Sequence, residues 1–275
     1  MKLVTFRTAD GHRAGRLDGD RVTEIDATDV GTLMNQDGWR EVAADAFGAE
    51  HDLADLDLAP VIPSPSKIVC VGLNYRNHIL EMGRELPEHP TLFAKFPDTL
   101  TGPYDDIVLP PEDDAIDWEG ELVIVIGTTC RRASPAEAEA AIAGYTLAND
   151  VSMRTWQFRT IAWLQGKAWD ASTPLGPALV TTDEWSPGAP ITTVLNGETV
   201  QEAPTSDLVH GPADLVSYVS TMTTLRPGDI ILTGTPGGVG HARQPARYLA
   251  DGDELVTSIH GLGELRNVVV TEAVG

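Results

Sequence analysis

The chain has 275 residues, of which 42% are hydrophobic, so it is long enough for one large domain or for a small domain followed by a larger one. It carries 41 acidic and 19 basic side chains, which gives a formal net charge of −22. This balance argues against DNA, RNA and anionic membranes as partners, because all three require basic patches. The N-terminus lacks the apolar core of a signal peptide, and no segment approaches the roughly 18 apolar residues of a membrane span. We therefore predict a cytoplasmic protein.

The first 60 residues show only weak secondary-structure patterns. Short strands are predicted there, joined by turns at Asp10-Gly11 and at residues 18–20, and a helix is predicted near residues 39–47. The stretch "PVIPSPSK" then places prolines at positions 60, 63 and 65, which favours an extended linker and excludes a helix. We therefore predict a small N-terminal domain at residues 1–60 and a second domain at residues 61–275.

Strand patterns dominate the second part of the chain. Apolar runs that predict strands are "KIVCVG", "TLFAKF", "LVIVIG", "GYTLAND", "PALVTT", "DIILTG", "DELVTSIHG" and "GELRNVVV". The stretch "ITTVLNGETVQ" predicts a hairpin that turns at Asn196-Gly197. Helices are fewer. One is predicted after Ser134 as N-cap, with Glu137 completing a capping box, and another has apolar residues at helical spacing and ends at Pro227-Gly228. The pattern predicts a β-rich α+β fold rather than an alternating βαβ fold.

Several common functional motifs are absent from the sequence. It contains no H-E-x-x-H, G-x-S-x-G or Walker A pattern, and its two cysteines, Cys70 and Cys130, form neither a disulfide framework nor a zinc site. Cys70 lies in an apolar run and is expected to be buried. The glycine-rich stretch "TGTPGGVG" follows a strand but precedes no helical pattern, so it is either a tight turn or a backbone nest for a carboxylate.

Three carboxylates stand beside apolar strands. In "DWEGELVIVIG", Glu119 and Glu121 are two residues apart, so on a strand their side chains project from the same face. Asp150 ends another apolar run, "GYTLANDVS". Two glutamates at the start of a strand could simply be exposed. If all three acids converge, however, they would suit a hard divalent cation, and oxygen-only ligation favours Mg²⁺, Mn²⁺ or Ca²⁺ over zinc. Open positions on such an ion suit catalysis.

Two further groups of polar residues could carry chemistry. His78 and Glu81 share a face if their segment is helical, and a carboxylate beside an imidazole builds a general base for water, although a surface ion pair explains the spacing as well. Arg154, Gln157 and Lys167 follow the third carboxylate. They could contact a substrate carboxylate or a developing oxyanion, or they could be solvated surface groups.

The order of these motifs resembles the fumarylacetoacetate hydrolase (FAH) family across residues 65–272. The resemblance rests on "VGLNYRNHILEMG", "LFAKF", "DWEGELVIVIG", "GYTLANDVSMR", "GKAWDASTPLGP" and "ILTGTPGGVG". It implies a mixed β-sandwich roll with a small N-terminal domain, which is generally dimeric. It also implies roles for individual residues: Glu119, Glu121 and Asp150 as ligands of Mg²⁺ or Mn²⁺, His78 and Glu81 as a dyad on a lid-like segment, Lys167 as an oxyanion and substrate group, and Arg154, Gln157 and Thr235 as substrate-binding residues.

The resemblance further implies a small anionic 2-oxo acid as substrate. The expected reaction is C–C bond hydrolysis of a 2,4-dioxo acid, of the acylpyruvate or fumarylpyruvate type, through a metal-bound enolate, with His78 and Glu81 activating water. The same metal site would also serve an isomerase or decarboxylase of 2-oxoheptenedioate-type aromatic catabolites, or an oxaloacetate decarboxylase. Because "CVGLNY" lacks the extra acid of the eukaryotic tyrosine-pathway members, and residues 167–177 resemble the bacterial catabolic members, fumarylacetoacetate itself is not the expected substrate.

Overall fold

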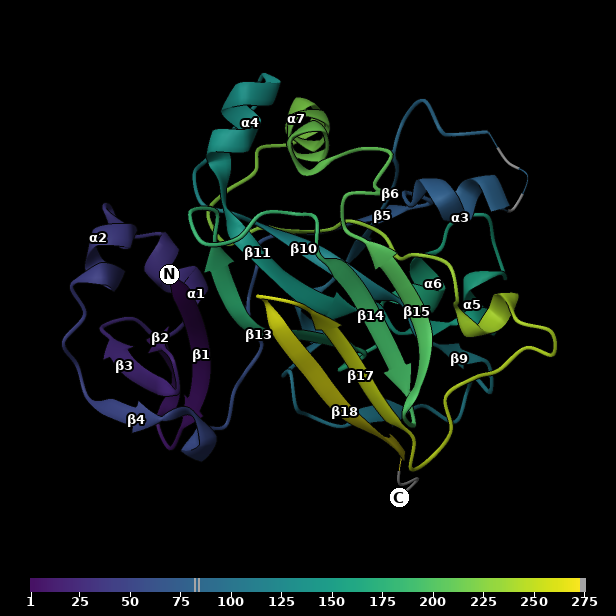
Figure 1. The fold of residues 1–275 in the computed structure, drawn as a ribbon, viewed down its shortest axis with the longest axis horizontal. Helices are drawn as coiled ribbons and strands as arrows, with labels where there is room; N and C mark the ends of the chain where they lie inside the picture. Colours follow the sequence, from purple (N-terminus) through teal and green to yellow (C-terminus); the bar gives the residue numbers. More distant parts are fainter. Residues whose placement is uncertain (82, 84, 273–275) are drawn as a thin grey trace.

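The computed structural model describes residues 1–81, 83 and 85–272, apart from the side chains of His78 and Glu81. Within these residues, most strands belong to two sheets, and the short helices lie at their edges and ends (Figure 1). The predicted β-rich α+β class is therefore confirmed. No helix in the described residues is both long and apolar enough to cross a membrane.

The larger sheet joins the N-terminal strands to the centre of the molecule. In the described residues it has eleven strands in the order β4-β3-β2-β1-β13-β11-β10-β16-β5-β6, and β7 pairs with β13. The strands are β1 (Lys2–Thr8), β2 (Gly11–Asp18), β3 (Arg21–Ile25), β4 (Glu50–Asp52), β5 (Ile68–Gly72), β6 (Thr91–Lys95), β7 (Leu100–Thr101), β10 (Gly120–Ile126), β11 (Ile142–Asn149), β13 (Thr173–Thr181) and β16 (Ile230–Leu232). Most neighbours are antiparallel, but β16 runs parallel to β5, and β7 runs parallel to β13.

The second sheet packs against the centre of the first. Its order is β15-β14-β17-β18-β8, and its strands lie against β10, β11 and β13. The strands are β8 (Ile107–Leu109), β14 (Pro190–Leu195), β15 (Glu198–Pro204), β17 (Glu254–Ile259) and β18 (Gly263–Thr271). Two short strands, β9 (Ile116–Asp117) and β12 (Ser152–Met153), pair with each other.

The helices are short. They are α1 (Val30–Met34), α2 (Trp39–Ala44), α3 (Arg76–Glu81), α4 (Pro135–Ala141), α5 (Arg154–Gln157), α6 (Leu164–Lys167) and α7 (Pro212–Met222), with 3₁₀ turns η1 (Leu53–Asp55), η2 (Pro97–Thr99) and η3 (Gly240–Ala242). Helices α4 and α7 lie side by side beyond the ends of β11 and β10 (Figure 1). The predicted capping box of Ser134 and Glu137 opens α4. Helix α7 ends at Met222, five residues before the predicted end at Pro227, because Thr223 is already extended and Leu225 pairs with Cys130.

A missing side chain at Gly120 lets the two sheets approach closely. A Cβ at this position would lie 2.5 Å from Thr193 Oγ1 and 3.0 Å from Thr257 Cγ2, both on the second sheet. Because side chains alternate along a strand, this contact is on the face opposite to Glu121. Packing behind β10 therefore fixes the strand that carries Glu121 and directly follows Glu119.

The N-terminal strands are continuous with the rest of the fold. Strand β1 pairs with β13 through Lys2 and Val180, and the predicted linker is packed, with Val61 and Ile62 buried. Thr5 donates its hydroxyl proton to the carbonyl of Val61 at 2.8 Å. The division at residue 60 stays a prediction about domains. In the described structure a shared sheet and a shared apolar core cross that position.

Candidate active site

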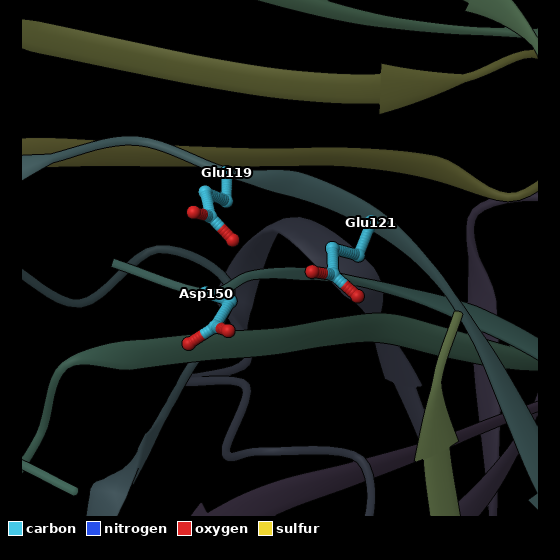
Figure 2. Close-up of side chains that lie close together, drawn as sticks. All are labelled: Glu119, Glu121 and Asp150. Atoms are coloured by element: carbon cyan, nitrogen blue, oxygen red, sulfur yellow. The ribbon is translucent and has the colours of Figure 1, made fainter. Parts of the chain in front are cut away.

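The register between β10 and β11 brings three carboxylates together. Gly120 lies opposite Asn149 in this antiparallel pair, and the N–H of Asp150 donates to the carbonyl of Glu119 at 2.8 Å. Glu121 is two residues further along and faces the same side. One oxygen from each of Glu119, Glu121 and Asp150 lies within 4.8 Å of the others, and the side chains extend into one space (Figure 2). The predicted convergence is therefore present in the structure.

Three cationic side chains surround this cluster, and all are buried. Lys167 Nζ contacts Glu119 Oε2 at 2.7 Å and Asp150 Oδ2 at 2.8 Å. Lys95 Nζ contacts the other oxygen of Asp150 at 2.6 Å, and Arg154 Nη1 contacts Glu119 Oε1 at 2.6 Å. Burial alone would raise the pKa of Asp150, but Lys167 and Lys95 outweigh it and hold that pKa below its ordinary value. Asp150 is thus a stable carboxylate in a dry environment.

Glu121 has no such partner. In the part of the chain that the structure describes, no lysine or arginine forms an ion pair with it, and the N–H of Gly234 donates to its Oε2 at 2.7 Å. Burial first, and then the charges of Asp150 and Glu119, raise the pKa of Glu121 well above its usual range. A buried carboxylate beside two others is costly unless a cation accompanies it. This orphaned acid is therefore the strongest sign of a cation site.

The charges and donor atoms of the cluster fit a divalent metal. Its carboxylates are Asp117, Glu119, Glu121 and Asp150, and its cations are Lys95, Arg154 and Lys167. Four negative and three positive groups leave a formal charge of −1, which a divalent cation would change to +1. The three converging ligands offer only oxygen, which suits Mg²⁺ or Mn²⁺. A metal held here would be a resident cofactor, and both its presence and its identity stay a prediction.

Asp117 was not among the predicted site residues, yet it organises the outer part of the cluster. This fully buried carboxylate accepts hydrogen bonds from Arg154 Nε at 2.9 Å and Nη2 at 2.7 Å. It also accepts the backbone N–H groups of Gly240 and His241 at 2.7 and 2.9 Å. Arg154 in turn donates to Gln157 Oε1 at 2.8 Å. Asp117, which lies two positions before Glu119 in the sequence, therefore orients Arg154 toward Glu119.

The glycine-rich segment after β16 closes one side of the site. The N–H of Gly234 binds the Glu121 carboxylate, and those of Gly240 and His241 bind Asp117, so the segment acts as a backbone nest for carboxylates of the protein itself. The hydroxyl of Thr235 donates to the carbonyl of Gly120 at 3.0 Å. Thr235 therefore lies directly beside the ligand strand, where a role in substrate binding stays a prediction.

A pocket of about 440 Å³ opens onto the charged cluster. Its lining combines polar groups from the cluster with aromatic and aliphatic side chains: Val71, Gly72, Leu73, Phe93, Glu119, Arg154, Gln157, Phe158, Trp163, Lys167, Thr235, Val239, His241 and Ala242. Other surface depressions reach similar volumes. One of about 450 Å³ is lined by residues of the N-terminal strands and shares no residue with the cluster. Convergent polar groups, rather than volume, mark the first pocket as the candidate active site.

The predicted dyad cannot be placed in this pocket. His78 and Glu81 are in α3, so the helical segment that a shared face requires is present, but both side chains lie outside the described part of the structure. The start of their helix is firmly held. Asp207 Oδ2 accepts the N–H of Asn77 at 2.9 Å, and the buried amide of Asn74 donates to the carbonyls of His210 and Thr233 at 3.1 and 2.9 Å. The general-base role of the dyad stays a prediction.

Two buried charged residues were missed by the sequence reasoning. Lys95 lies at the end of "TLFAKF", and Asp117 precedes the two glutamates in "DWEGEL". A lysine that ends an apolar strand is a usable signal, because an unpaired charge is rarely buried. Its partner Asp150, however, is 55 positions away. The remaining predicted residues, Arg154, Gln157 and Lys167, are brought together and are buried rather than solvated.

Comparison with known proteins agrees with this architecture. Residues 67–270 match the family model described as fumarylacetoacetate (FAA) hydrolase C-terminal. The chain belongs to the fumarylacetoacetate hydrolase family. The predicted FAH-type fold and the assignment to a family of enzymes are thereby confirmed.

Relatives in this family carry different activities in their names. The mitochondrial oxaloacetate tautomerase of Rattus norvegicus is 46% identical over 216 residues, which cover 78% of this chain and 69% of the relative. The 2-hydroxyhepta-2,4-diene-1,7-dioate isomerase of Mycobacterium marinum is 33% identical with a TM-score of 0.82, covering 100% of both chains. The maleylpyruvate hydrolase of Sphingobium sp. SYK-6, solved with manganese(II) and pyruvate, is 30% identical with a TM-score of 0.82, covering 99% of this chain and 100% of the other.

Proposed function

We propose that the protein is a divalent-metal-dependent hydrolase that cleaves a C–C bond in a small 2,4-dioxo acid of the acylpyruvate type. The observation that carries this proposal is the buried group of Glu119, Glu121 and Asp150 beside a pocket of about 440 Å³. Support also comes from the hydrolase of similar fold, whose structure holds manganese and pyruvate. Pyruvate is the fragment that such a cleavage would release.

The three carboxylates would hold Mg²⁺ or Mn²⁺, which when bound would polarise the 2-oxo group and offset negative charge that develops on the substrate. Lys167 and Arg154 hold Glu119 and Asp150 in place through their ion pairs. Thr235 and Gln157 line the same pocket and orient the substrate carboxylate end. Preorganised donors of this kind stabilise charge without reorganising during the reaction.

Water is the second reactant. His78, oriented by Glu81, takes a proton from water as the resulting hydroxide adds to the C4 carbonyl carbon. The C3–C4 bond then breaks, and its electron pair stays on C3 as the enolate of pyruvate. His78 returns its proton to C3 to give pyruvate, and the acyl part leaves as a carboxylic acid. One water is consumed for each C–C bond that breaks.

A second candidate is an isomerase, tautomerase or decarboxylase that uses the same site on a 2-oxo diacid such as oxaloacetate. The specific observation in its favour is the 46% identity to the rat oxaloacetate tautomerase. Enolisation moves a proton between C3 and the 2-oxo oxygen and needs no attack by water. Decarboxylation instead breaks the bond to the distal carboxylate and leaves the same pyruvate enolate.

Product analysis separates these candidates. Purified protein is stripped with EDTA, reloaded with Mg²⁺ or Mn²⁺, and given acetylpyruvate or oxaloacetate. We expect loss of the acylpyruvate enol absorbance together with equimolar pyruvate and acetate, and no turnover without metal. Rapid enol–keto exchange of oxaloacetate without cleavage of acetylpyruvate would favour a tautomerase over a hydrolase. Release of CO₂ from oxaloacetate would identify a decarboxylase. Turnover that persists at full rate after metal removal would contradict both candidates.

A further inference from the structure

The pocket has a chemically distinct outer half. Its inner end is formed by the buried side chains of Glu119, Arg154 and Lys167, whereas its outer part is formed by the exposed side chains of Phe158 and His241. Phe93 lies near the inner end, with its ring centroid 5.3 Å from Lys167 Nζ. Phe158 and His241 pack against each other, with ring centroids 5.0 Å apart. When the 2-oxo acid end of a substrate lies beside the three carboxylates, the rest of the substrate extends toward Phe158 and His241.

The inner cations are already engaged by the protein. Lys167 binds two carboxylates, and Arg154 directs its Nε, Nη1 and Nη2 groups to Asp117, Glu119 and Gln157. They are therefore poorly placed to bind a second negative group at the far end of a substrate. In a chain with a formal net charge of −22, an anionic distal group would need a local donor to offset the surrounding negative field.

His241 is held in a position where it can act as such a donor. Its backbone N–H is fixed by Asp117 Oδ2 at 2.9 Å, and the preceding Gly240 is fixed by Oδ1 of the same carboxylate at 2.7 Å. Its ring Nδ1 lies 3.1 Å from the hydroxyl of Tyr248. If Tyr248 donates its proton to Nδ1, the imidazole proton resides on Nε2. Within the described residues, Nε2 has no hydrogen-bond partner, so it is free for a ligand.

We propose that His241 is a specificity-determining residue that binds the distal carboxylate of a 2-oxo dicarboxylic acid. The inference rests on the proposed function, because it assumes that the 2-oxo acid end occupies the inner half of the pocket. Asp117 then has a double role: it holds Arg154 at the inner end and His241 at the outer end. The two ends of the substrate would be recognised by groups fixed on one buried carboxylate. The aromatic side chains that line the same pocket suit a flat, unsaturated chain.

Binding of unreactive analogues tests the proposal without turnover. The Mn²⁺-loaded protein is titrated by calorimetry with 2-oxoadipate and with 2-oxohexanoate, which differ only in a distal carboxylate or methyl group. We expect the diacid to bind at least about 10-fold more tightly, because a hydrogen bond to a charged group is among the stronger ones. The His241→Phe variant keeps an aromatic ring against Phe158 and should lose this preference while binding the monoacid as before.

Two further variants sharpen the test. His241→Gln retains an N–H donor and should recover part of the preference, which a purely packing role would not require. Tyr248→Phe removes the hydroxyl that selects the ring tautomer and should weaken diacid binding only about 2-fold. His260→Phe, an exposed histidine outside the pocket, is the matched control.

The outcomes separate the two levels of the proposal. Equal affinity for diacid and monoacid in the wild type, or a preference that survives in His241→Phe, overturns the role of His241 and leaves the metal chemistry intact. If neither acid binds in the presence of Mn²⁺, the proposed function fails and the role of His241 fails with it. The monoacid affinity of each variant also reports that the variant is folded.

Discussion

Two groups of ion pairs in this protein use the same residue types in opposite environments. Lys95, at the end of β6, and Asp150, directly after β11, have side chains that are 0% exposed. Where the N-terminal strands meet the second sheet, Arg7 bridges Asp57 and Asp105, and these side chains are 32%, 67% and 26% exposed. The first group has lost its hydration, whereas the second keeps much of it. Distance alone does not distinguish them, because both groups contain contacts of 2.6 Å.

The difference shows which charges require a functional explanation. An exposed pair needs none, since water compensates each charge and the pair adds little to stability. A buried group of four carboxylates and three cations is harder to justify by stability, because apolar residues of similar volume would often serve as well or better. Among the described residues Glu121 has no cationic partner, and the proposed metal site would explain why such a buried group persists.

The largest expected effect is on activity, from Glu121→Gln. The amide keeps the shape and the acceptor for Gly234 but removes a metal ligand, so we expect metal-dependent activity to fall at least about 100-fold. The melting temperature of the metal-free protein should not fall, because the change relieves repulsion from Asp150 and Glu119. Activity assays and thermal unfolding in EDTA measure the two effects. Glu202→Gln, on an exposed position of β15, is the control, and retention of more than a tenth of wild-type activity would argue against a metal site.

The largest effect on stability is expected when one partner of a buried ion pair is replaced. Lys95→Met should lower the free energy of unfolding by about 3–5 kcal/mol, because it leaves buried Asp150 with one cation instead of two. Urea unfolding in EDTA measures this loss. The double variant with Asp150→Asn should recover much of it, and saturating Mn²⁺ should reduce it in the single variant. A loss below about 1 kcal/mol would mean that water reaches the cluster.

Local sequence patterns were enough to predict most strands and the three converging carboxylates. The alternation of side chains places Glu119 and Glu121 on one face, and an acid at the end of an apolar run identifies Asp150. What the pattern does not contain is the register. Asp150 lies opposite Glu119 only because Gly120 pairs with Asn149, and this pairing depends on the whole length of β10 and β11.

Long-range partners explain the rest of what was missed. Lys95 and Asp117 acquire their meaning from residues 55 and 37 positions away, which no local window includes. The N-terminal strands also pair with a segment that is distant in the sequence. Prolines near residue 60 predict a boundary, but the pairing of β1 with β13 joins segments that are nearly 180 positions apart. Motif order predicted the family, because it records several distant segments at once.

The contribution of the half-buried Arg7–Asp105 ion pair to the free energy of unfolding should change with pH in a defined range. Burial alone would raise the pKa of Asp105, but hydrogen bonds from Arg7, Gly102 and Thr101 outweigh it and lower the pKa. A lowered folded-state pKa means that the stabilisation is present above the unfolded-state pKa of about 3.9 and is lost as pH falls through the folded value. Asp105→Asn should therefore cost about 1 kcal/mol at pH 7 and progressively less below about pH 4. Urea unfolding from pH 7 to pH 3 measures this, and parallel curves for both proteins would contradict it.

The smallest effect is expected where the ion pairs face solvent. Arg266 on β18 pairs with Glu254 and Glu264, and the side chains of all three are about half exposed. Arg266→Gln should change the free energy of unfolding by less than about 0.5 kcal/mol, and high salt should abolish even that change, because exposed charges are screened. Urea unfolding at low and high salt tests this directly. If Arg266→Gln lowers the free energy of unfolding as much as Lys95→Met does, burial is not what distinguishes the buried ion pairs from the exposed ones. A small, salt-sensitive change would show that burial causes the difference.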